Sequence, residues 1–253
     1  MADSSLSGME ALVTGSSRHL GAEIASELAR RGATVTITYL TGRKQAEDVA
    51  RLLREETARP HHVIQADLSS PPSIRDFLGR FEREVGEVDI LVNNAGPFSM
   101  APFLDLAEEE WDRIWESNVR AAHLCSQALA PGMRRRGRGR IVNVSAGSAY
   151  IRNHSIYTLA KAALLTLTEA LALELGPEIS VNAVAPGQIA ESADDIAEFD
   201  PSFVERAIER TPLRRLVTRG EIATIVADMV GPTYDSVTGV TIPIDGGWRL
   251  NRF

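Results

Sequence analysis

Seven short runs of β-branched and apolar residues recur along the chain, and longer helical patterns separate most of them. A short apolar run bounded by turn residues is typical of a buried strand, whereas apolar residues three and four apart are typical of a helix. Strands that alternate with helices form parallel sheets with right-handed crossovers. We therefore expect an α/β fold: a doubly wound parallel sheet of about seven strands with helices on both faces.

The alternation gives approximate bounds for the elements. The expected strands are 10–14, 34–40, 62–66, 88–93, 140–145, 179–185 and 240–244. The expected helices are 20–31, 43–57, 74–85, 108–136 and 155–175. No low-complexity linker divides the chain, so residues 1–253 are expected to form a single domain. Residues 188–216 interrupt the pattern with acids and two prolines, which predicts an irregular, partly helical loop of the kind that often carries function.

Charge and composition exclude several classes of protein. A net charge of -7 argues against a general nucleic-acid or anionic-membrane binder, because both surfaces attract basic proteins. The basic run at 133–140 is interpreted as a solvated helix C-terminus. Cys125 is the only cysteine, so an internal disulfide is excluded. Residues 1–8 lack a signal-peptide pattern and no apolar run is long enough to cross a bilayer, which favours a cytoplasmic protein.

A glycine-containing turn, residues 14–21, joins the first expected strand to the first expected helix. It reads Thr-Gly-Ser-Ser-Arg-His-Leu-Gly. Glycines let the backbone of such a turn approach a pyrophosphate, and the helix that follows presents its N-terminus to the phosphates. Two glycines alone are weak evidence, but their position between a strand and a helix favours a dinucleotide site.

This turn resembles the Thr-Gly-x-x-x-Gly-x-Gly motif of the short-chain dehydrogenases/reductases. The resemblance extends over almost the whole chain, through Asn-Asn-Ala-Gly at 93–96, Tyr-x-x-x-Lys at 157–161, Pro-Gly at 186–187 and Asp-Gly-Gly at 245–247. It implies a single Rossmann-type domain and an adenine contact from Asp67. The cofactor-binding residues that it implies are Gly15, Ser17, Arg18, His19, Leu20, Gly21, Tyr39, Arg43, Asp67, Leu68, Asn94, Ala95, Gly96, Pro186, Gly187 and Ile189.

Two positions depart from the family pattern. His19 replaces the middle glycine of the turn, as a large basic residue does in pteridine reductases. It is either a tolerated surface side chain or an imidazole placed over a cofactor phosphate. Glu191 stands where the family frequently has a threonine, which puts one contact with the cofactor amide in doubt.

The end of the second expected strand favours NADP(H) over NAD. An NAD enzyme usually carries an acid there for the ribose 2′-hydroxyl, but residues 39–42 are Tyr-Leu-Thr-Gly. The nearby charged residues are Arg18, Arg43 and Lys44, which would attract a 2′-phosphate. Arg43 and Lys44 could instead begin a solvated helix, so Arg18, inside the turn, is the stronger candidate.

Tyr157 and Lys161 are four residues apart in an expected helix and therefore face the same side. A nearby ammonium is expected to lower the pKa of the phenol, which is ordinarily about 10. The phenol could then exchange a proton with a carbonyl oxygen while the cofactor exchanges a hydride with the carbon. This pair is the predicted catalytic centre.

The resemblance implies two further catalytic groups, an asparagine and a serine. Asn118 matches the asparagine. The family commonly places its serine thirteen residues before the tyrosine, where this chain has Val144, whereas an alignment on Asn143 puts Ala146 there. Of the two nearby hydroxyls we favour Ser145, because it ends the expected strand that points at the nicotinamide. Ser148 stays open as the alternative.

Phe98, Tyr150, Asn153 and Ser192 are the predicted substrate-binding residues, together with the loop 188–216. Ketoreductases that tailor aromatic polyketides, especially angucycline-type ones, resemble the chain at 14–21, 93–98 and 186–192. The expected function is therefore NADPH-dependent reduction of a small or polycyclic aromatic ketone in polyketide antibiotic biosynthesis. No metal is expected, and the family resemblance implies a homotetramer.

Other functions remain open. The 3-oxoacyl-carrier-protein reductases resemble the chain over its full length, and pteridine reductases share the altered turn. Pteridine reductases usually have an aspartate in the serine position, and none lies near Ser145. A non-catalytic NADP-binding regulator is the alternative of another class, and the presence of Asn118, Tyr157 and Lys161 argues against it.

Overall fold

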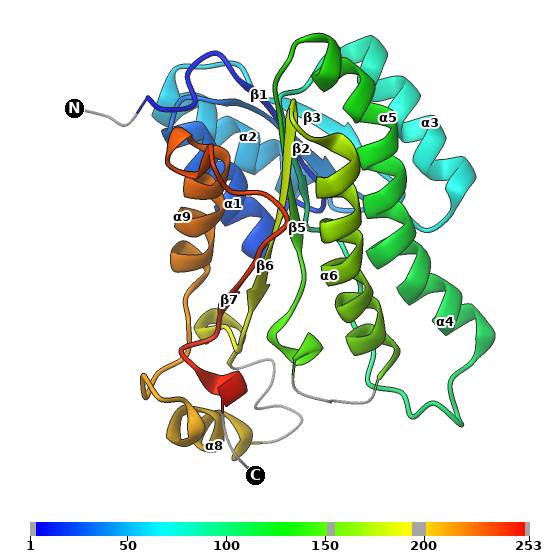
Figure 1. Cartoon of the computed structure of the whole chain (residues 1–253), viewed down its shortest axis with the longest axis vertical. Helices are drawn as coiled ribbons and strands as arrows, with labels where there is room; N and C mark the ends of the chain where they lie inside the picture. The colour runs from blue at the N-terminus through cyan, green and yellow to red at the C-terminus, as the bar shows by residue number, and fades with distance from the viewer. Residues whose placement is uncertain (1–3, 151–154, 194–200, 251–253) are drawn as a thin grey trace.

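One parallel sheet forms the centre of the protein (Figure 1). The computed structural model describes residues 4–150, 155–193 and 201–250. Within them seven parallel strands lie in the order β3-β2-β1-β4-β5-β6-β7. Their bounds are β1 (Glu10–Val13), β2 (Thr34–Tyr39), β3 (His62–Gln65), β4 (Ile90–Asn93), β5 (Gly139–Val144), β6 (Ile179–Pro186) and β7 (Thr241–Ile244). The expected doubly wound, Rossmann-type sheet is confirmed.

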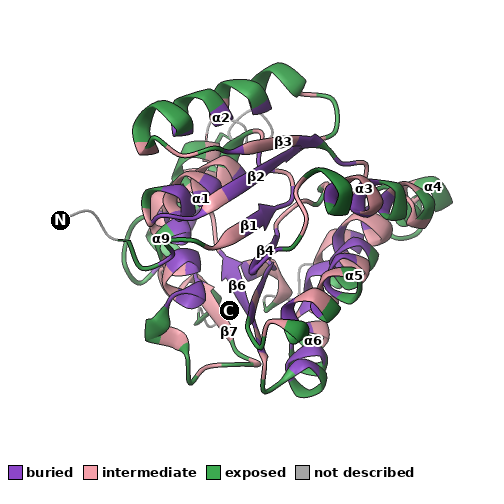
Figure 2. Ribbon diagram, turned by 90° about the horizontal axis from the view of Figure 1, so that it is seen from above, coloured by how far each residue is buried: buried purple, intermediate pink, exposed green. Residues whose placement is uncertain are grey.

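Helices cover both faces of the sheet (Figure 2). One face carries α1 (His19–Arg30), α2 (Arg43–Thr57) and α9 (Arg219–Val230). The other carries α3 (Pro71–Glu84), α5 (Ala121–Arg135) and α6 (Ile156–Leu175). Successive strand residues point to opposite faces, so Ala11 and Val13 enter the first core and Leu12 enters the second. Burial on both faces explains why the central strands β1 and β4 are mostly apolar.

The strand order places a crevice at the carboxyl edge of the sheet. β1 pairs with β2 on one side and with β4 on the other, so successive crossovers run in opposite directions from this point. In doubly wound sheets, ligands bind at the carboxyl ends of the strands where the order reverses. The turns after β1 and β4 therefore meet at the expected ligand site.

The helical stretch expected at 108–136 is divided into three parts. It consists of α4 (Glu108–Trp115), a π-helical turn (Glu116–Arg120) and α5. Asn118 is the central residue of the π-helical turn. Such turns often occur at functional sites, because the extra residue changes the direction in which a side chain points.

Helix α9 was not expected from the sequence. It begins with a capping box, in which Thr218 Oγ1 accepts a hydrogen bond from Glu221 N (3.2 Å) and Glu221 Oε2 accepts one from Thr218 N (2.9 Å). Thr-x-x-Glu before an apolar run is the sequence signal that would have revealed it. The loop 188–216 is partly helical, as expected, and contains a short turn (Ala190–Ser192) and α8 (Phe203–Arg210).

Helix α6 is unusually apolar for a surface helix. By length and composition alone it could cross a membrane, with a mean hydropathy of 1.4, so the expectation that no segment reaches this threshold was wrong. A core helix passes the same test, and α6 packs on β6 and carries the buried Lys161. Its outward side nevertheless exposes Leu159 and Leu173, at 43% and 88%.

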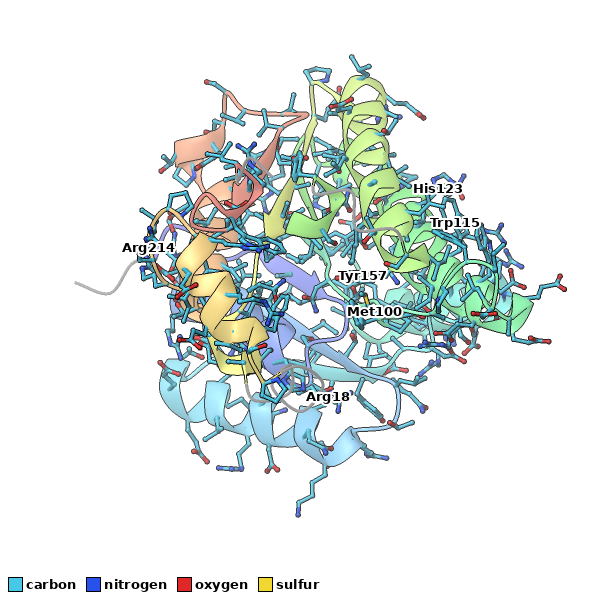
Figure 3. All side chains as sticks on the ribbon, turned by 90° about the horizontal axis from the view of Figure 1, so that it is seen from below. Arg18, Met100, Trp115, His123, Tyr157 and Arg214 are labelled. Carbon is cyan, nitrogen blue, oxygen red and sulfur yellow. The ribbon has the colours of Figure 1, made fainter. Side chains whose placement is uncertain are left out.

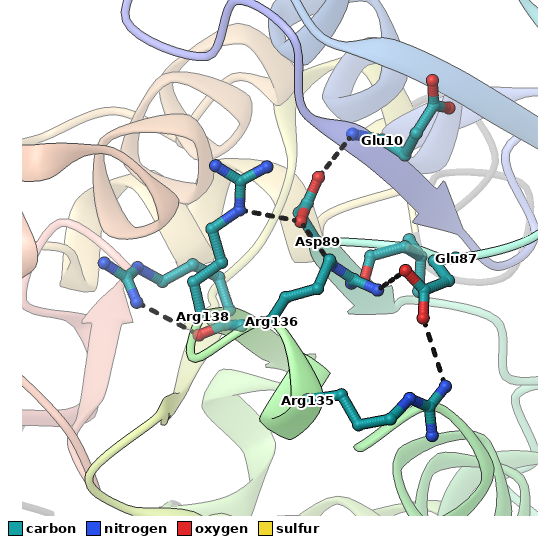
Figure 4. A network of polar contacts seen from close by, with 9 residues as sticks. Glu10, Glu87, Asp89, Arg135, Arg136 and Arg138 are labelled. Atoms are coloured by element: carbon teal, nitrogen blue, oxygen red, sulfur yellow. Dashed lines mark hydrogen bonds and ion pairs between the residues drawn. The ribbon is translucent and has the colours of Figure 1, made fainter. Parts of the chain in front are cut away.

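The basic run at the end of α5 was expected to be solvated. Several of its arginines instead pair with acids just before β4 (Figure 4). Asp89, whose side chain is 7% exposed, accepts hydrogen bonds from Arg136 Nε (3.3 Å) and Arg138 Nε (3.1 Å). It also accepts one from the backbone N of Glu10 (3.1 Å). Glu87 pairs with Arg135 and Arg136. These contacts join α5 to the amino-terminal edge of β1 and β4.

Removal of the Asp89 carboxylate should therefore destabilise the protein. Asp89→Ala leaves the half-buried Arg136, the more exposed Arg138 and the backbone N–H of Glu10 without this acceptor. We expect the free energy of unfolding to fall by about 3 kcal/mol. Asp76→Ala is the control. Asp76 is 71% exposed in its ion pair with Arg80, so its loss should lower the free energy of unfolding by less than about 1 kcal/mol. Chemical denaturation of both variants makes the comparison. Equal stability of Asp89→Ala and the wild type would contradict this account.

Candidate active site

The turn after β1 is fixed by two hydroxyl groups, that of Ser16 in the turn itself and that of Thr38 in β2. Gly15 N donates to Thr38 Oγ1 (2.8 Å), and Ser16 Oγ donates to Val13 O (2.7 Å) while accepting from Thr38 N (2.9 Å). Gly15 has a φ of +65°, and a Cβ there would lie 3.0 Å from Ala95. A Cβ on Gly21 would lie 2.3 Å from Gly15 O. Both glycines are therefore required by close backbone approach.

The departure at His19 has a conformational consequence. His19 has a φ of +51°, in the left-handed region that favours glycine. Histidine is among the non-glycine residues found there more often than average. The fold therefore keeps the backbone conformation that a glycine would adopt, and places an exposed imidazole at the first position of α1.

Arg18 and Arg43 differ in their surroundings near the end of β2. Arg18 precedes α1 and is exposed, and its side chain makes no capping hydrogen bond to α1 within the described structure. Arg43 Nε donates to Glu47 Oε1 at 2.7 Å, which compensates part of its charge. Tyr39 is half-buried at the end of β2. Arg18, which is labelled in Figure 3, is thus the cation of this pair that is better placed to receive an anion.

The end of β4 is tied directly to the turn after β1. Thr14 Oγ1 accepts hydrogen bonds from Asn94 N (2.9 Å) and Ala95 N (3.0 Å). Asn94 Nδ2 donates to Thr14 O (2.9 Å) and Gly15 O (3.3 Å). The Asn-Asn-Ala-Gly segment therefore helps to build the wall of the crevice beside the glycine turn.

The predicted adenine region lies after β3. Asp67 Oδ1 accepts hydrogen bonds from Ser69 N (2.9 Å) and Ser69 Oγ (2.6 Å), which fix the orientation of the carboxylate. Leu68 is 8% exposed and belongs to the core, so its backbone rather than its side chain is available to a ligand.

Asn118 and Gly96 lie in close contact. Asn118 Nδ2 donates to Ile114 O (2.9 Å) and Pro97 O (3.1 Å), while its buried Oδ1 has no hydrogen-bond partner within the described segments. A Cβ on Gly96 would lie 2.1 Å from that Oδ1. The geometry thus holds Asn118 against the end of β4 with an unused acceptor, which fits a residue that receives a hydrogen bond only when ligand or water is bound.

Tyr157 and Lys161 lie in the first turns of α6. Ser155 Oγ caps this helix by accepting from Thr158 N (3.2 Å). Lys161 Nζ lies 5.5 Å from the centroid of the Tyr157 ring and donates to Val144 O (2.8 Å). The ring of Phe98 packs edge-on against Tyr157, with centroids 4.9 Å apart. The spacing in sequence therefore brings the predicted pair together, with an aromatic neighbour from another loop.

The pKa of Tyr157 differs from the expectation. Burial raises it to about 12, and burial lowers the pKa of Lys161 to about 8. The predicted fall in the tyrosine pKa was wrong for the free protein. Lys161 directs its ammonium to a backbone carbonyl, so desolvation outweighs attraction between the two side chains.

The two candidate serines have different environments. Ser145 is 3% exposed and its Oγ donates to the backbone O of Lys161 at 2.7 Å. Ser148 lies in the short helical turn Gly147–Ala149, and its buried Oγ has no hydrogen-bond partner in the described part of the chain.

The late motifs form the opposite wall of the crevice. Gly187 N donates to Ile244 O (2.8 Å), and a Cβ on Gly187 would lie 2.7 Å from Asp245 Cβ. Pro186 ends β6, and Ile189 forms a parallel bridge with Val217. These contacts bring residues 186–189 to the carboxyl edge of the sheet.

Glu191 and Ser192 are held by a residue that the sequence did not indicate. The Glu191 carboxylate accepts from Arg219 N (3.1 and 3.2 Å), and Arg219 Nη2 donates to Glu191 O and Ser192 Oγ (both 3.2 Å). Arg219 was missed because α9 was not expected. Its contacts join the first residues of the loop 188–216 to the N-terminus of α9, and the Glu191 carboxylate is occupied by the backbone N–H of Arg219.

Three of the four predicted substrate-binding residues lie at or near this edge. Phe98 is 61% exposed and Tyr150 is 38% exposed, with the Arg249 guanidinium 5.5 Å from the Tyr150 ring. Ser192 is half-buried beside Arg219. Asn153 lies outside the described residues.

Comparison with known proteins identifies the family of the chain. A family model described as enoyl-(acyl carrier protein) reductase matches residues 15–249. An uncharacterised oxidoreductase of Escherichia coli, YohF, is 38% identical over 245 residues and 95% of each chain. L-xylulose reductase from Bos taurus is 36% identical, over 97% of this chain and 98% of its own.

A solved structure extends the likeness to three dimensions. L-sorbose reductase from Gluconobacter frateurii, complexed with NADPH and L-sorbose, superposes with a TM-score of 0.90. It is 28% identical and covers 99% of this chain and 100% of its own. The fold, the order of the motifs and the matched length lead to one conclusion: the chain belongs to the short-chain dehydrogenase/reductase family of oxidoreductases.

Proposed function

We propose that this protein is an NADPH-dependent ketoreductase that transfers a hydride to the carbonyl of a small or polycyclic aromatic ketone. The observation that carries the proposal is the position of Tyr157. Its ring lies beside Lys161 and the exposed Phe98, at the carboxyl edge of a sheet whose turns are built from glycines. Reduction of a ketone needs a dinucleotide, a proton donor and an apolar contact for the substrate at one place.

The residues present fit a bound dinucleotide. Gly15, Gly21 and Gly96 lie where a side chain would collide with the neighbouring backbone or with Asn118. At these positions the backbone carries no side chain that would keep a cofactor away. The first turn of α1 presents backbone N–H groups, which stabilise phosphates. Asp67 and Leu68 would hold the adenine end, and residues 94–96 and 186–189 the nicotinamide end. When bound, the cofactor supplies the hydride.

Arg18 would bind the 2′-phosphate and so select NADPH. It is exposed at the start of α1, and no acid follows β2 that would repel the phosphate. His19 and Ser17 lie in the same turn, and Tyr39 and Arg43 border it. The related L-sorbose reductase structure, which holds NADPH, supports this choice.

Tyr157 would donate the proton. The phenol is protonated at neutral pH, because its ordinary pKa is about 10 and burial raises it further, to about 12. As the hydride reaches the carbonyl carbon, negative charge develops on the oxygen and the phenol can protonate it. Lys161 would then stabilise the phenolate. The unused Asn118 Oδ1 would hold a water through which a proton returns from solvent.

The substrate is proposed to be aromatic. Phe98, Met100 and Tyr150 expose apolar surface near the catalytic pair, at 61%, 55% and 38%, which suits a planar ring system. We propose that the chain acts as one domain in which the loop 188–216, held at its base by Arg219, selects the ketone. An angucycline-type polyketide intermediate, reduced in the cytoplasm during antibiotic biosynthesis, fits this lining.

Other substrates are the alternatives. The relatives named L-xylulose reductase and L-sorbose reductase favour a sugar ketone, and the family description favours an acyl chain on a carrier protein. Turnover of NADPH with a polycyclic aromatic diketone, L-xylulose and a 3-oxoacyl thioester distinguishes them. NADPH binding without turnover of any ketone would instead support a non-catalytic regulator.

A homo-oligomer is proposed, a tetramer by family resemblance, in which the surface of α6 would supply one contact between two copies. Leu159, Thr166 and Leu173 are seven residues apart and therefore share one exposed face of the helix. Association of two copies would cover this apolar face.

We predict that Arg18→Ala weakens NADPH binding about 10-fold or more and leaves NADH binding unchanged. A charge-assisted hydrogen bond contributes about 1.5–3 kcal/mol, which corresponds to that range. Fluorescence titration measures both affinities. Arg51→Ala removes the same charge from the exposed side of α2 and is the control. Equal weakening by the two substitutions would show that Arg18 acts only through net charge.

We predict that Tyr157→Phe lowers kcat by about 100- to 10,000-fold, because the change removes the transferable proton and little volume. NADPH affinity should stay within a factor of two. Tyr234→Phe is the control: it makes the same chemical change at a tyrosine that packs against the core on the other face of the sheet, and kcat should be normal. Near-normal turnover by Tyr157→Phe would refute the assignment of the proton donor.

We predict that Leu173→Asp dissociates the oligomer, since a charge would be buried at the proposed contact. Light scattering at micromolar concentration measures the mass. Leu104→Asp is the matched control, because Leu104 is 101% exposed in the segment before α4. A monomeric wild type, or dissociation by both substitutions, would contradict the role of α6.

A further inference from the structure

The hydroxyl of Ser145 is already committed in the free protein. Ser145 Oγ donates its single proton to the backbone O of Lys161 at 2.7 Å, and the residue is 3% exposed. Lys161 Nζ returns a hydrogen bond to Val144 O at 2.8 Å. The two bonds tie the end of β5 to α6. To donate a hydrogen bond to a ketone oxygen, Ser145 would have to break this buried bond.

The hydroxyl of Ser148 has the opposite character. Its Oγ is buried and has no partner among the residues that the structure describes. A buried hydroxyl without a partner is energetically unfavourable and calls for an explanation. Among the described residues the other such hydroxyl is Thr36 Oγ1, which lies inside β2. Asn118 Oδ1 is a second orphan at the same edge of the sheet. Two unused polar atoms thus accompany Tyr157 in the free protein.

The position of Ser148 is compatible with a contact to substrate. The turn Gly147–Ala149 follows β5 and contacts both α6 and the end of β6. A Cβ on Gly147 would lie 3.1 Å from Pro186 O, so the turn is packed between the helix that carries Tyr157 and the wall formed by residues 186–187. Neither Val144 nor Ala146, the two residues that sequence alignment places in the serine position, has a hydroxyl.

We propose that Ser148, rather than Ser145, supplies the hydroxyl that binds the ketone oxygen beside Tyr157; the assignment rests on the proposed reductase function. Ser148 donates a hydrogen bond to the carbonyl oxygen and keeps its proton throughout. The hydride of NADPH forms the new C–H bond, the C=O π bond breaks, and Tyr157 transfers its proton to the oxygen. A proton from solvent restores Tyr157, and the products are the alcohol and NADP⁺. Ser145 is a positioning residue for Lys161.

The test measures kcat, NADPH affinity and Tm of the serine variants and the wild type. The probe ketones are 9,10-phenanthrenequinone and L-xylulose. We expect Ser148→Ala to lower kcat about 100-fold, as loss of one donor to a developing oxyanion does. NADPH affinity should be unchanged, and Tm should not fall because the removed hydroxyl has no partner. Ser148→Thr should recover most of the activity. Ser145→Ala should lower Tm and reduce kcat less than Ser148→Ala does.

The outcomes separate the serine assignment from the proposed function. Wild-type turnover together with a Ser148→Ala kcat within twofold of normal would overturn the assignment to Ser148. A 100-fold loss in Ser145→Ala at unchanged Tm would return the role to Ser145. NADPH binding by the wild type with no turnover of either ketone, or of the acyl thioester, would overturn the reductase function and this assignment with it.

Discussion

The contact between the ends of β1 and β4 is the constraint on which the rest of the site depends. One hydroxyl, Thr14 Oγ1, accepts the backbone N–H groups of Asn94 and Ala95. It joins strands that are neighbours in the sheet but about 80 residues apart in the chain. Because the strand order reverses here, these hydrogen bonds hold the glycine turn against residues 94–96 at the expected ligand site.

Polar groups at the two edges of the sheet have different surroundings. At the amino-terminal edge, Asp89 gathers two guanidinium groups and a backbone N–H, while Glu10 Oε2 and Arg140 Nε have no hydrogen-bond partner among the described residues. At the carboxyl edge, Asn118 Oδ1 and Ser148 Oγ stay without partners within the described chain. A site that must bind a carbonyl and relay a proton requires unused hydrogen-bonding capacity, and its cost is offset by packing elsewhere.

Desolvation determines the direction of both pKa shifts in the proposed catalytic pair, Tyr157 and Lys161. Tyr157 is held in its protonated form and Lys161 loses part of its preference for the charged form. A proton donor that remains protonated at neutral pH suits reduction, which consumes a proton. The helix spacing brings the two side chains together, but the hydrogen bond from Lys161 to Val144 decides where the ammonium points.

The sequence by itself determined the doubly wound sheet, the glycine turn and the pairing of Tyr157 with Lys161, because these follow from local periodicity and short spacings. Tertiary structure decided what depends on distant contacts. Helix α9 with Arg219, the division of 108–136 by a π-helical turn, and the different environments of Ser145 and Ser148 arise from packing between separate elements. A hydroxyl's hydrogen-bond partner and a buried group's pKa are set by neighbours far along the chain, so spacing in the sequence does not reveal them.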